Sequence, residues 1–379
     1  MLTLVLGLLT ALGPVSIDLY LPAFPALRQD LGAGDAAVQL TLTGMTIGLA
    51  VGQLLIGAWS DRVGRRTPLL LSSGLHLIAT IGCAVAPTIG VLAACRVAQG
   101  VGAAGSAVLV LAIVRDRAEG KALVTLLSRV ALVTTLAPLL APVAGAEILA
   151  ARGWRGIFAV LAVASALVLV AAAVVVPETG RPSPPKRLGG VLRDRRFRQA
   201  TLVAAMTYAG IYAYVAASPL LLQTVYGLSP RAFAVVFLIN SLGLVLGVQL
   251  ASMLIRRYET PQVLTGFAGV TVVAAAAIVL LPWPGVLVCL FVFVAGCGGC
   301  FPCAEGLALH GQGEQSGTAS SVHGFATFGA AGLIAPVPGL IGVTGAGPLA
   351  VVLLATSVTA VIGARRMARP AYVDRPCGY

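Results

Sequence analysis

Long apolar runs alternate with short polar breaks along the whole chain. At a rise of about 1.5 Å per residue, each run is long enough for a helix to cross roughly 30 Å of hydrocarbon. Twelve runs lie near residues 3–23, 38–59, 67–86, 90–114, 122–149, 155–176, 199–222, 232–255, 262–282, 286–309, 317–342 and 347–364. The pattern predicts an all-α membrane protein with twelve spanning helices. The first run contains Pro14 and Asp18 and has no basic residues before it, which favours a span over a removable signal.

The longest polar break, Pro177 to Arg198, is rich in proline and arginine. It divides the predicted spans six and six. We therefore expect an N-terminal six-helix bundle over 1–176, a cytoplasmic linker over 177–198, a C-terminal six-helix bundle over 199–366 and a cytoplasmic tail over 367–379. Two sets of six spans are typical of transporters built from two pseudo-symmetric halves around a central cavity.

Composition supports a membrane location. The 379 residues are 58% hydrophobic and 10% charged, whereas soluble domains carry about 25% charged residues. Of the 25 Lys and Arg residues, 19 fall in alternate loops and the tail, four in the intervening loops and two within apolar runs. This positive-inside bias predicts a multi-pass protein of the inner (cell) membrane with both termini in the cytoplasm. The net charge of +12 does not indicate nucleic-acid binding, because the basic residues share no continuous face.

A compact charged turn separates the second and third runs. It has the sequence Gly57-Ala58-Trp59-Ser60-Asp61-Arg62-Val63-Gly64-Arg65-Arg66. It resembles the G-x-x-x-D-R-x-G-R-R signature of the major facilitator superfamily at every defining position. The resemblance implies a cytoplasmic latch that holds the two halves together in the outward-facing state. The alternative is a plain positive-inside anchor.

Asp18 is the candidate proton carrier. A carboxylate within a spanning helix is costly unless it is paired, protonated or facing water. Burial disfavours the ionised form and a nearby cation favours it, so a carboxylate between these influences can bind and release a proton during transport. The alternative is a helix-end cap near the outer interface, since only about five residues of the run follow Asp18.

Arg96 is the expected partner of Asp18. It begins the stretch Arg96–Ala104, which resembles the superfamily's R-x-x-Q-G-x-G-A signature, whose arginine is associated with proton coupling. A buried arginine needs an acceptor, for which Asp18 is the first choice and Glu147 the second. The alternative is an Arg96 side chain that reaches the outer interface.

Two further motifs are interpreted as helix packing. The G-x-G-x-x-G pattern that starts at Gly100 is formally a dinucleotide fingerprint, but it follows no strand and lies inside an apolar run. The C-x-x-C-x-x-C pattern that starts at Cys297 has the spacing of a metal site, but it also lies within an apolar run, where cysteine is a small packing residue. We therefore expect no nucleotide, no metal and no other cofactor.

The fifth run contains Pro138, Pro142 and Gly145. It resembles the antiporter signature G-P-x-x-G-G of the superfamily, which marks exporters, although it departs from that signature at several glycine positions. The alternative is a generic kinked membrane helix.

Longer stretches resemble the Bcr/CflA drug-resistance transporters, a branch of drug:proton antiporters with twelve spans. They are Asp18–Pro25, Gly52–Gly57, Trp154–Phe158, Ala217–Pro219 and Gly317–Ser321. The resemblance covers essentially the whole chain and implies a monomeric exporter. Thr10 stands where some drug antiporters of this kind carry a second membrane acid, so a single membrane carboxylate is expected and doubly charged substrates are disfavoured.

Several polar and aromatic residues are candidates for a substrate cavity. They are Tyr20, Gln99, Tyr208, Tyr212, Tyr214, Asn240 and Gln249. Tyr208 and Tyr212 lie one helical turn apart and should share a face. Each of these residues could instead pack or lie at an interface. His310 and His323 titrate near neutral pH in general, but packing or interface roles are favoured for them.

The sequence thus predicts proton-driven export of small, mostly apolar drugs by alternating access, with the proton gradient as the energy source. Its expected partners are a small-molecule substrate, protons and the lipid bilayer. The first alternative is an exporter of an endogenous metabolite or amino acid on the same scaffold. A membrane sensor is disfavoured because no soluble signalling domain is evident, and an enzyme because no nucleophile–base or metal constellation appears.

Overall fold

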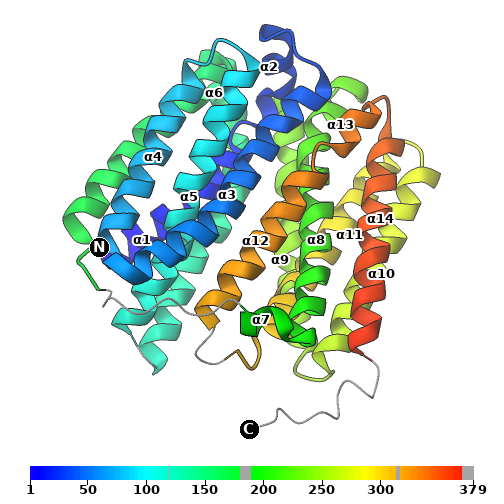
Figure 1. The fold of residues 1–379 in the computed structure, drawn as a ribbon. Coiled ribbons are helices and arrows are strands. Elements are labelled where there is room, and N and C mark those ends of the chain that lie inside the picture. The colour runs from blue at the N-terminus through cyan, green and yellow to red at the C-terminus, as the bar shows by residue number, and fades with distance from the viewer. Residues whose placement is uncertain (119, 180–188, 313–315, 369–379) are drawn as a thin grey trace. The chain divides into compact units, whose positions relative to one another are not determined.

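Figure 1 shows the computed structural model, which describes residues 1–118, 120–179, 189–312 and 316–368. Every regular element in these residues is helical, as the apolar pattern predicts. The chain divides into two compact units. Unit 1 comprises Met1–Pro185 with Gly227–Val235, and unit 2 comprises Lys186–Tyr226 with Val236–Tyr379. The arginines of the tail beyond Ala368, and those at 181 and 187, lie outside the described residues.

The helices of unit 1 are joined by short turns. They are α1 (Leu2–Asp18), the 3-10 turn η1 (Leu21–Ala23), α2 (Phe24–Asp30), α3 (Asp35–Val63), α4 (Arg66–Ala84), α5 (Ile89–Arg117) and α6 (Gly120–Val175). Helix α1 packs against α5 and α6, and α5 also packs against α3 and α4. These contacts gather the first apolar runs around one core, which includes Leu6, Leu9 and Val110.

Helix α6 contains two predicted spans. Its 56 residues would extend about 84 Å at 1.5 Å per residue, far more than the roughly 30 Å of hydrocarbon. The backbone is non-helical at Gly153, where φ is 68° and ψ is −178°. A positive φ of this kind is readily adopted by glycine and rarely by other residues. The described residues contain eleven long apolar helices when α6 counts as one, and the break at Gly153 restores the predicted twelve.

Unit 2 holds most of the remaining elements. These are α7 (Gly189–Arg193), α8 (Arg195–Leu220), the π-helical turn η2 (Leu221–Val225), α9 (Pro230–Leu254), α10 (Thr260–Leu280), α11 (Gly285–Leu309), α12 (Ser316–Ile334), α13 (Val337–Ile341) and α14 (Ala346–Met367). Helix α7 and the start of α8 fall within the predicted linker. They are held there because Val191 and Phe197 are buried in the core of this unit.

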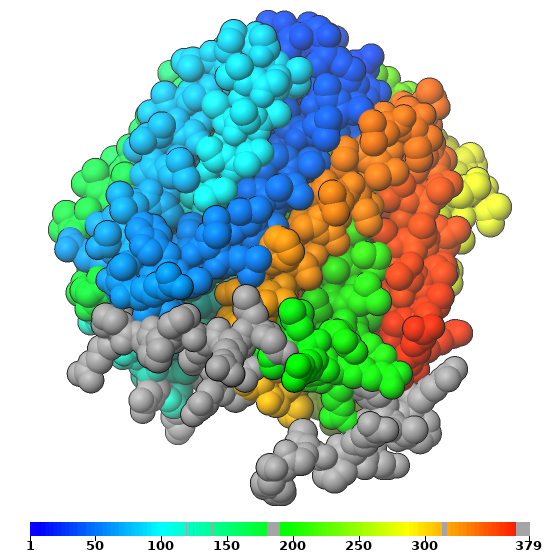
Figure 2. Space-filling model, in the orientation of Figure 1, coloured from blue at the N-terminus to red at the C-terminus, as the bar shows by residue number. Residues whose placement is uncertain are grey.

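Helix α8 is central to the packing of unit 2. It contacts α11, α12 and α14, and the space-filling view shows α12 (orange) and α14 (red) on either side of α8 (green) (Figure 2). The single apolar run at 317–342 is divided into α12 and α13. The division falls at Ala335 and Pro336, because proline lacks the N–H that a continuous helix needs.

Glycines bring two pairs of helices into close contact. In unit 1, a Cβ on Gly48 of α3 would lie 2.1 Å from the Val97 carbonyl oxygen, and one on Gly100 of α5 would lie 2.1 Å from the Met45 carbonyl oxygen. The glycine pattern that begins at Gly100 therefore acts in helix packing, as predicted. Small residues allow such close approach of membrane helices.

A close helix crossing at glycines also occurs in unit 2. A Cβ on Gly247 of α9 would lie 1.9 Å from the Ala295 carbonyl oxygen, and one on Gly298 of α11 would lie 2.2 Å from the Leu244 carbonyl oxygen. In the twelve-span count, these helices are the second and fourth of the last six, as α3 and α5 are of the first six. The repeated crossing is the kind of internal similarity that a duplicated transporter scaffold produces.

Candidate functional site

Asp18 is the last residue of α1 and is buried. The helical path does not end there, because η1 and α2 continue it to Asp30. Among the described residues, Asp18 forms no hydrogen bond and no ion pair. The expected ion pair between Asp18 and Arg96 is therefore not present in this structure. A helix-end cap would need a backbone N–H partner, which Asp18 also lacks within the described residues.

Arg96 is fully buried on α5 rather than directed to an interface. Its Nη1 donates to the Ser16 carbonyl oxygen at 2.8 Å and to Gln99 Oε1 at 2.6 Å. The guanidinium carbon lies 4.3 Å from the ring centroid of Tyr20 and 5.9 Å from that of Phe158. Its Nε and Nη2 have no hydrogen-bond partner in the described structure. Backbone oxygen and aromatic faces thus replace the carboxylate that the sequence suggested.

The second-choice acceptor, Glu147, has a different partner. Arg231 donates to it through Nε to Oε1 and through Nη2 to Oε2, both at 2.7 Å. Both residues group with unit 1 and are exposed. Glu147 is thereby unavailable to Arg96 in this structure.

His76 is a central polar residue that the sequence analysis did not identify. It is fully buried on α4. Its Nε2 lies 2.9 Å from Ser16 Oγ on α1, and its Nδ1 lies 3.3 Å from Ser165 Oγ on α6. A single histidine in an apolar helix carries no sequence signature, so only the fold reveals that it joins three helices.

Two predicted cavity residues belong to the same polar cluster. Gln99 donates through Nε2 to Thr80 Oγ1 at 2.7 Å, which leaves its Oε1 to accept from Arg96. The Tyr20 hydroxyl lies 3.1 Å from Thr41 Oγ1. The first half of the molecule therefore has a buried polar network around Arg96, and Ser16, which is part of it, precedes Asp18 by two residues.

The predicted antiporter motif packs beside Asp18. A Cβ on Gly145 of α6 would lie 1.9 Å from the carbonyl oxygen of Leu19, the residue after Asp18. Pro142 is buried on the same helix, which also carries Pro138. Glycine at position 145 allows α6 to approach the end of α1 next to Asp18.

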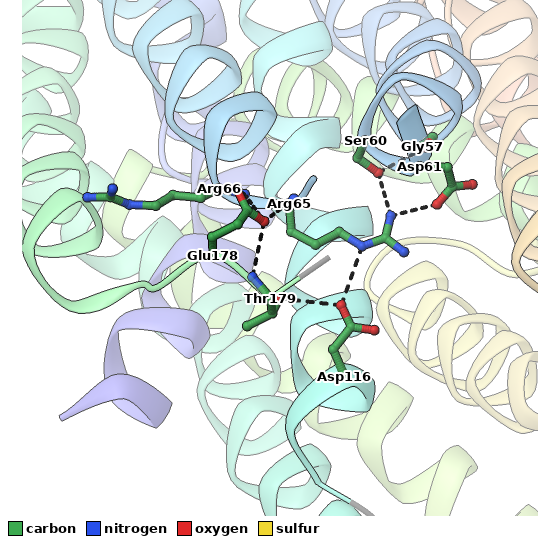
Figure 3. A network of polar contacts seen from close by, with 8 residues as sticks. All are labelled: Gly57, Ser60, Asp61, Arg65, Arg66, Asp116, Glu178 and Thr179. Atoms are coloured by element: carbon green, nitrogen blue, oxygen red, sulfur yellow. Dashed lines mark hydrogen bonds and ion pairs between the residues drawn. The ribbon is translucent and has the colours of Figure 1, made fainter. Parts of the chain in front are cut away.

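The 57–66 turn forms a polar network within unit 1 (Figure 3). Arg65 Nη1 donates to Asp61 Oδ1 at 2.6 Å and to Ser60 Oγ at 2.7 Å, and Nε lies 3.5 Å from Asp116 Oδ2 on α5. Figure 3 shows the Arg65 side chain lying between the carboxylates of Asp61 and Asp116. Arg62 is exposed, Gly57 is buried, and Arg66 Nη2 donates to the Ala173 carbonyl oxygen at 2.7 Å.

Glu178, which the sequence analysis did not single out, binds the start of α4. Its Oε1 accepts from the Arg65 backbone N–H at 2.6 Å, and its Oε2 accepts from that of Arg66 at 3.2 Å. Gly64 has a φ of 97°, and a Cβ there would lie 2.8 Å from the Glu178 carboxyl carbon. The turn therefore requires glycine for its conformation and for the space that Glu178 occupies.

Replacing Glu178 by Gln should weaken this attachment. The carboxylate opposes the positive end of the α4 dipole and accepts from free N–H groups of its first turn. Because the site is exposed, we expect a loss of only about 0.5–1 kcal/mol in stability, seen as a lower midpoint of thermal unfolding in detergent. Glu259→Gln at the start of α10 is the matched control, since no side-chain cap bond is formed there. An equal shift in both variants would contradict a specific role for Glu178.

Four of the five predicted cavity residues of unit 2 form two pairs. Tyr208 and Tyr212 are stacked with centroids 6.3 Å apart, which confirms their shared face. Asn240 Nδ2 donates to the Tyr214 hydroxyl at 2.7 Å, and both side chains are buried. Gln249 is exposed on α9.

The cysteines and histidines of unit 2 that the structure describes are buried or lie at the surface. Cys297, Cys300 and Cys303 are buried on α11. His323 Nδ1 and Thr201 Oγ1 share a hydrogen bond of 3.0 Å. His310 follows the end of α11 and is exposed. In the part of the chain that the structure describes, no group of three or more metal-ligating side chains comes together.

Comparison with known proteins places these features in a family. The model of the Major Facilitator Superfamily matches residues 6–336. The "Uncharacterized MFS-type transporter YdgK" of Bacillus subtilis (strain 168) is 34% identical over 96% of this chain and 93% of that protein. The "Multidrug resistance protein MdtL" of Shigella flexneri serotype 5b is 28% identical over 93% of this chain and 92% of its own length.

Solved structures agree on the fold. A D-xylose-proton symporter superimposes with a TM-score of 0.77 at 18% identity, covering 97% of both chains. A bacterial homologue of the human lysosomal transporter Spinster gives a TM-score of 0.76 at 19% identity over 96% of this chain. Identities this low show the fold alone. The family match, the relative at 34% identity and the apolar helices together establish that the chain is a membrane transporter of the major facilitator superfamily.

Proposed function

We propose that the protein exports small, mostly apolar drugs across the inner membrane in exchange for protons, as a Bcr/CflA-type antiporter. The observation that carries this proposal is Asp18, a buried carboxylate without a partner among the described residues, at a break in the first span. Such groups in membrane proteins mark proton or substrate pathways. The similarity to the multidrug resistance protein MdtL supports drugs as the substrate class.

In the proposed transport cycle, Asp18 takes a proton from outside as drug leaves and releases it inside as drug binds. Arg96 contacts α1 at the Ser16 carbonyl, close to this carboxylate in sequence. It would favour the ionised form when the guanidinium approaches Asp18 and the protonated form when it withdraws. The two free donors of Arg96, Nε and Nη2, are the groups that such an approach would engage.

The remaining features fit the same proposal. The basic residues of alternate loops favour both termini in the cytoplasm. The turn at 57–66 would then lie on the cytoplasmic side, where its ordered Arg65 network would serve as a latch of the outward-facing state. Gly145 and its neighbouring prolines would let α6 shift against α1 during transport. The transporter is proposed to act as a monomer.

Substitution of Asp18 by Asn tests the proposal directly. In acid-loaded inverted vesicles, a panel of neutral antibiotics should cause proton release with wild type. Asn has nearly the size of Asp but carries no exchangeable carboxyl proton, so we expect substrate-dependent release to fall to the level of empty vesicles. The readout is a pH-sensitive dye inside or outside the vesicles.

The control is Glu259→Gln, which removes an exposed acid at the start of α10 and should release protons like wild type. Unchanged release by Asp18→Asn would remove Asp18 as the carrier. If folded wild type released no protons with any antibiotic, drug export would be wrong. Export of an endogenous metabolite would then become the better assignment.

A further inference from the structure

A closed circuit of hydrogen bonds joins α1, α4 and α5 in unit 1. The His76 side chain on α4 meets Ser16 Oγ on α1 at 2.9 Å, and the Ser16 carbonyl oxygen accepts from Arg96 Nη1 on α5 at 2.8 Å. Arg96 also donates to Gln99, whose Nε2 donates to Thr80 Oγ1. Thr80 closes the circuit, because its hydroxyl donates at 2.6 Å to the backbone carbonyl oxygen of His76. Every member of the circuit is buried.

The hydroxyl of Ser16 determines which nitrogen of His76 carries a proton. A serine hydroxyl has one proton to donate, and that of Ser16 donates to the Leu12 carbonyl oxygen at 2.6 Å. Ser16 Oγ therefore accepts from His76, and Nε2 is the protonated nitrogen. Because His76 is fully buried and forms no ion pair within the described residues, a neutral imidazole is expected. Its Nδ1 is then an acceptor, which faces Ser165 Oγ on α6 at 3.3 Å.

Ser16 is held through both its side chain and its backbone. It lies in the last turn of α1, where carbonyl groups lack partners within the helix, and Arg96 supplies such a partner from α5. His76 holds the hydroxyl of the same residue from α4. Asp18 follows two residues later and ends the helix. The two contacts therefore fix the last turn of α1, and with it the backbone from which the Asp18 carboxylate extends.

We propose that His76, as its Nε2–H tautomer, is a positioning residue for proton coupling. Its N–H fixes Ser16 and thereby keeps the Ser16 carbonyl within reach of Arg96 and the Asp18 carboxylate at a constant place. The inference rests on the proposed export function and adds to it a residue that the Asp18 proton cycle does not yet include. His76 carries no transported proton in this role, and the property that it must keep is one N–H group at the Nε2 position.

Two substitutions of His76 test the position of the donor. The side-chain amide nitrogen of Gln can lie about where Nε2 lies, whereas that of Asn lies about where Nδ1 lies. His76→Gln should therefore still donate to Ser16 and keep most of the substrate-driven proton release in inverted vesicles. His76→Asn cannot reach Ser16, and its rate of release should fall about tenfold or more, because a small displacement of the reacting group is costly.

The matched control is His323→Asn, which makes the same exchange at a buried histidine of unit 2 and should release protons like wild type. Thermal unfolding of the same preparations gives the folded fraction of each variant. Equal release per folded molecule by His76→Gln and His76→Asn would overturn the positioning role and leave His76 as a packing residue.

Nitrogen NMR spectroscopy measures the tautomer itself. The chain has three histidines, so full-length protein labelled only at histidine, without a polyhistidine tag and in lipid nanodiscs, gives few signals. The His76 signals are those that disappear in His76→Gln. Protonated and unprotonated imidazole nitrogens differ widely in chemical shift, and we expect a protonated Nε2 and an unprotonated Nδ1. The opposite pattern, with the proton on Nδ1, would overturn the assignment.

The two measurements separate this inference from the export function. The tautomer is measured without substrate and does not depend on transport. Substrate-driven release by wild type that is equal in both His76 variants would leave export standing and remove the positioning role. If wild type released no protons with any antibiotic, export and the coupling role would both be wrong, while the NMR result would still establish or overturn the Nε2–H tautomer.

Discussion

Replacement of Gly100 by Leu is expected to prevent accumulation of folded protein. The Cβ alone would lie 2.1 Å from the Met45 carbonyl oxygen and 2.9 Å from the Leu49 backbone nitrogen. Both are backbone atoms of α3, so no side-chain rotation can relieve the clash. Forcing α3 and α5 apart would open the packing of unit 1 at a cost above about 3 kcal/mol, a large part of the stability of an ordinary domain. Fluorescence-detected size-exclusion chromatography of a tagged protein measures the loss.

Gly90→Leu is the matched control for this prediction. Gly90 lies on the same helix α5, and a Cβ there meets nothing within 4 Å. The same change in hydrophobicity is therefore made on the same helix without the clash. We expect this variant to elute as a folded monodisperse protein. Comparable yields and unfolding midpoints for the two variants would show that the α3–α5 crossing is not as close as described.

The features that follow from local chemistry were predictable from the sequence. Apolar runs of spanning length become helices because lipid offers no partners for free backbone groups. Gly153 separates two spans within α6 because glycine readily adopts a positive φ, and the predicted boundary between the fifth and sixth runs falls there. The glycines from Gly100 onward were assigned to packing for the same local reason, since small residues in apolar helices permit close crossings.

The features that depend on three-dimensional partners were not predictable. Arg96 was expected to pair with a carboxylate. In the fold, it instead contacts a backbone carbonyl and two aromatic rings. His76 sits in an apolar run with no distinctive neighbours, and its two serine partners lie on distant segments. Glu178 lies just after the sixth predicted run. Its partner at the start of α4 is more than a hundred residues away in the sequence, so local sequence does not reveal the contact.

Glu305 was missed for a different reason. The expectation of a single membrane carboxylate rested on Thr10, which stands where some related antiporters carry a second acid, and so it concerned only the first span. Glu305 lies in the tenth predicted run and is exposed on α11. Its carboxylate is visible in the sequence as an acid within an apolar run.

Replacement of Arg96 by Met is expected to separate stability from function. Arg96 is fully buried, and its Nε and Nη2 lack partners in the described structure. Exchanging such a buried charge for an apolar side chain of similar length is often neutral or stabilising. Against this, the Ser16 carbonyl and Gln99 lose a donor, at a cost of about 1–3 kcal/mol. The net change in unfolding free energy should therefore be within about 2 kcal/mol of zero.

Transport by Arg96→Met should nevertheless fall to background. In the proposed cycle, the guanidinium is the cation that favours the ionised form of Asp18, so the carboxylate of this variant is expected to stay protonated. Arg96→Lys is the companion variant. Its ammonium keeps the charge but cannot reproduce the planar fork that reaches Ser16 and Gln99 together, and partial proton-coupled export is expected. Thermal unfolding and substrate-driven proton release are measured on the same vesicle preparations. If Arg96→Met instead unfolded early and lost activity only in proportion to its folded fraction, Arg96 would be a structural residue, and the proposed control of Asp18 would be wrong.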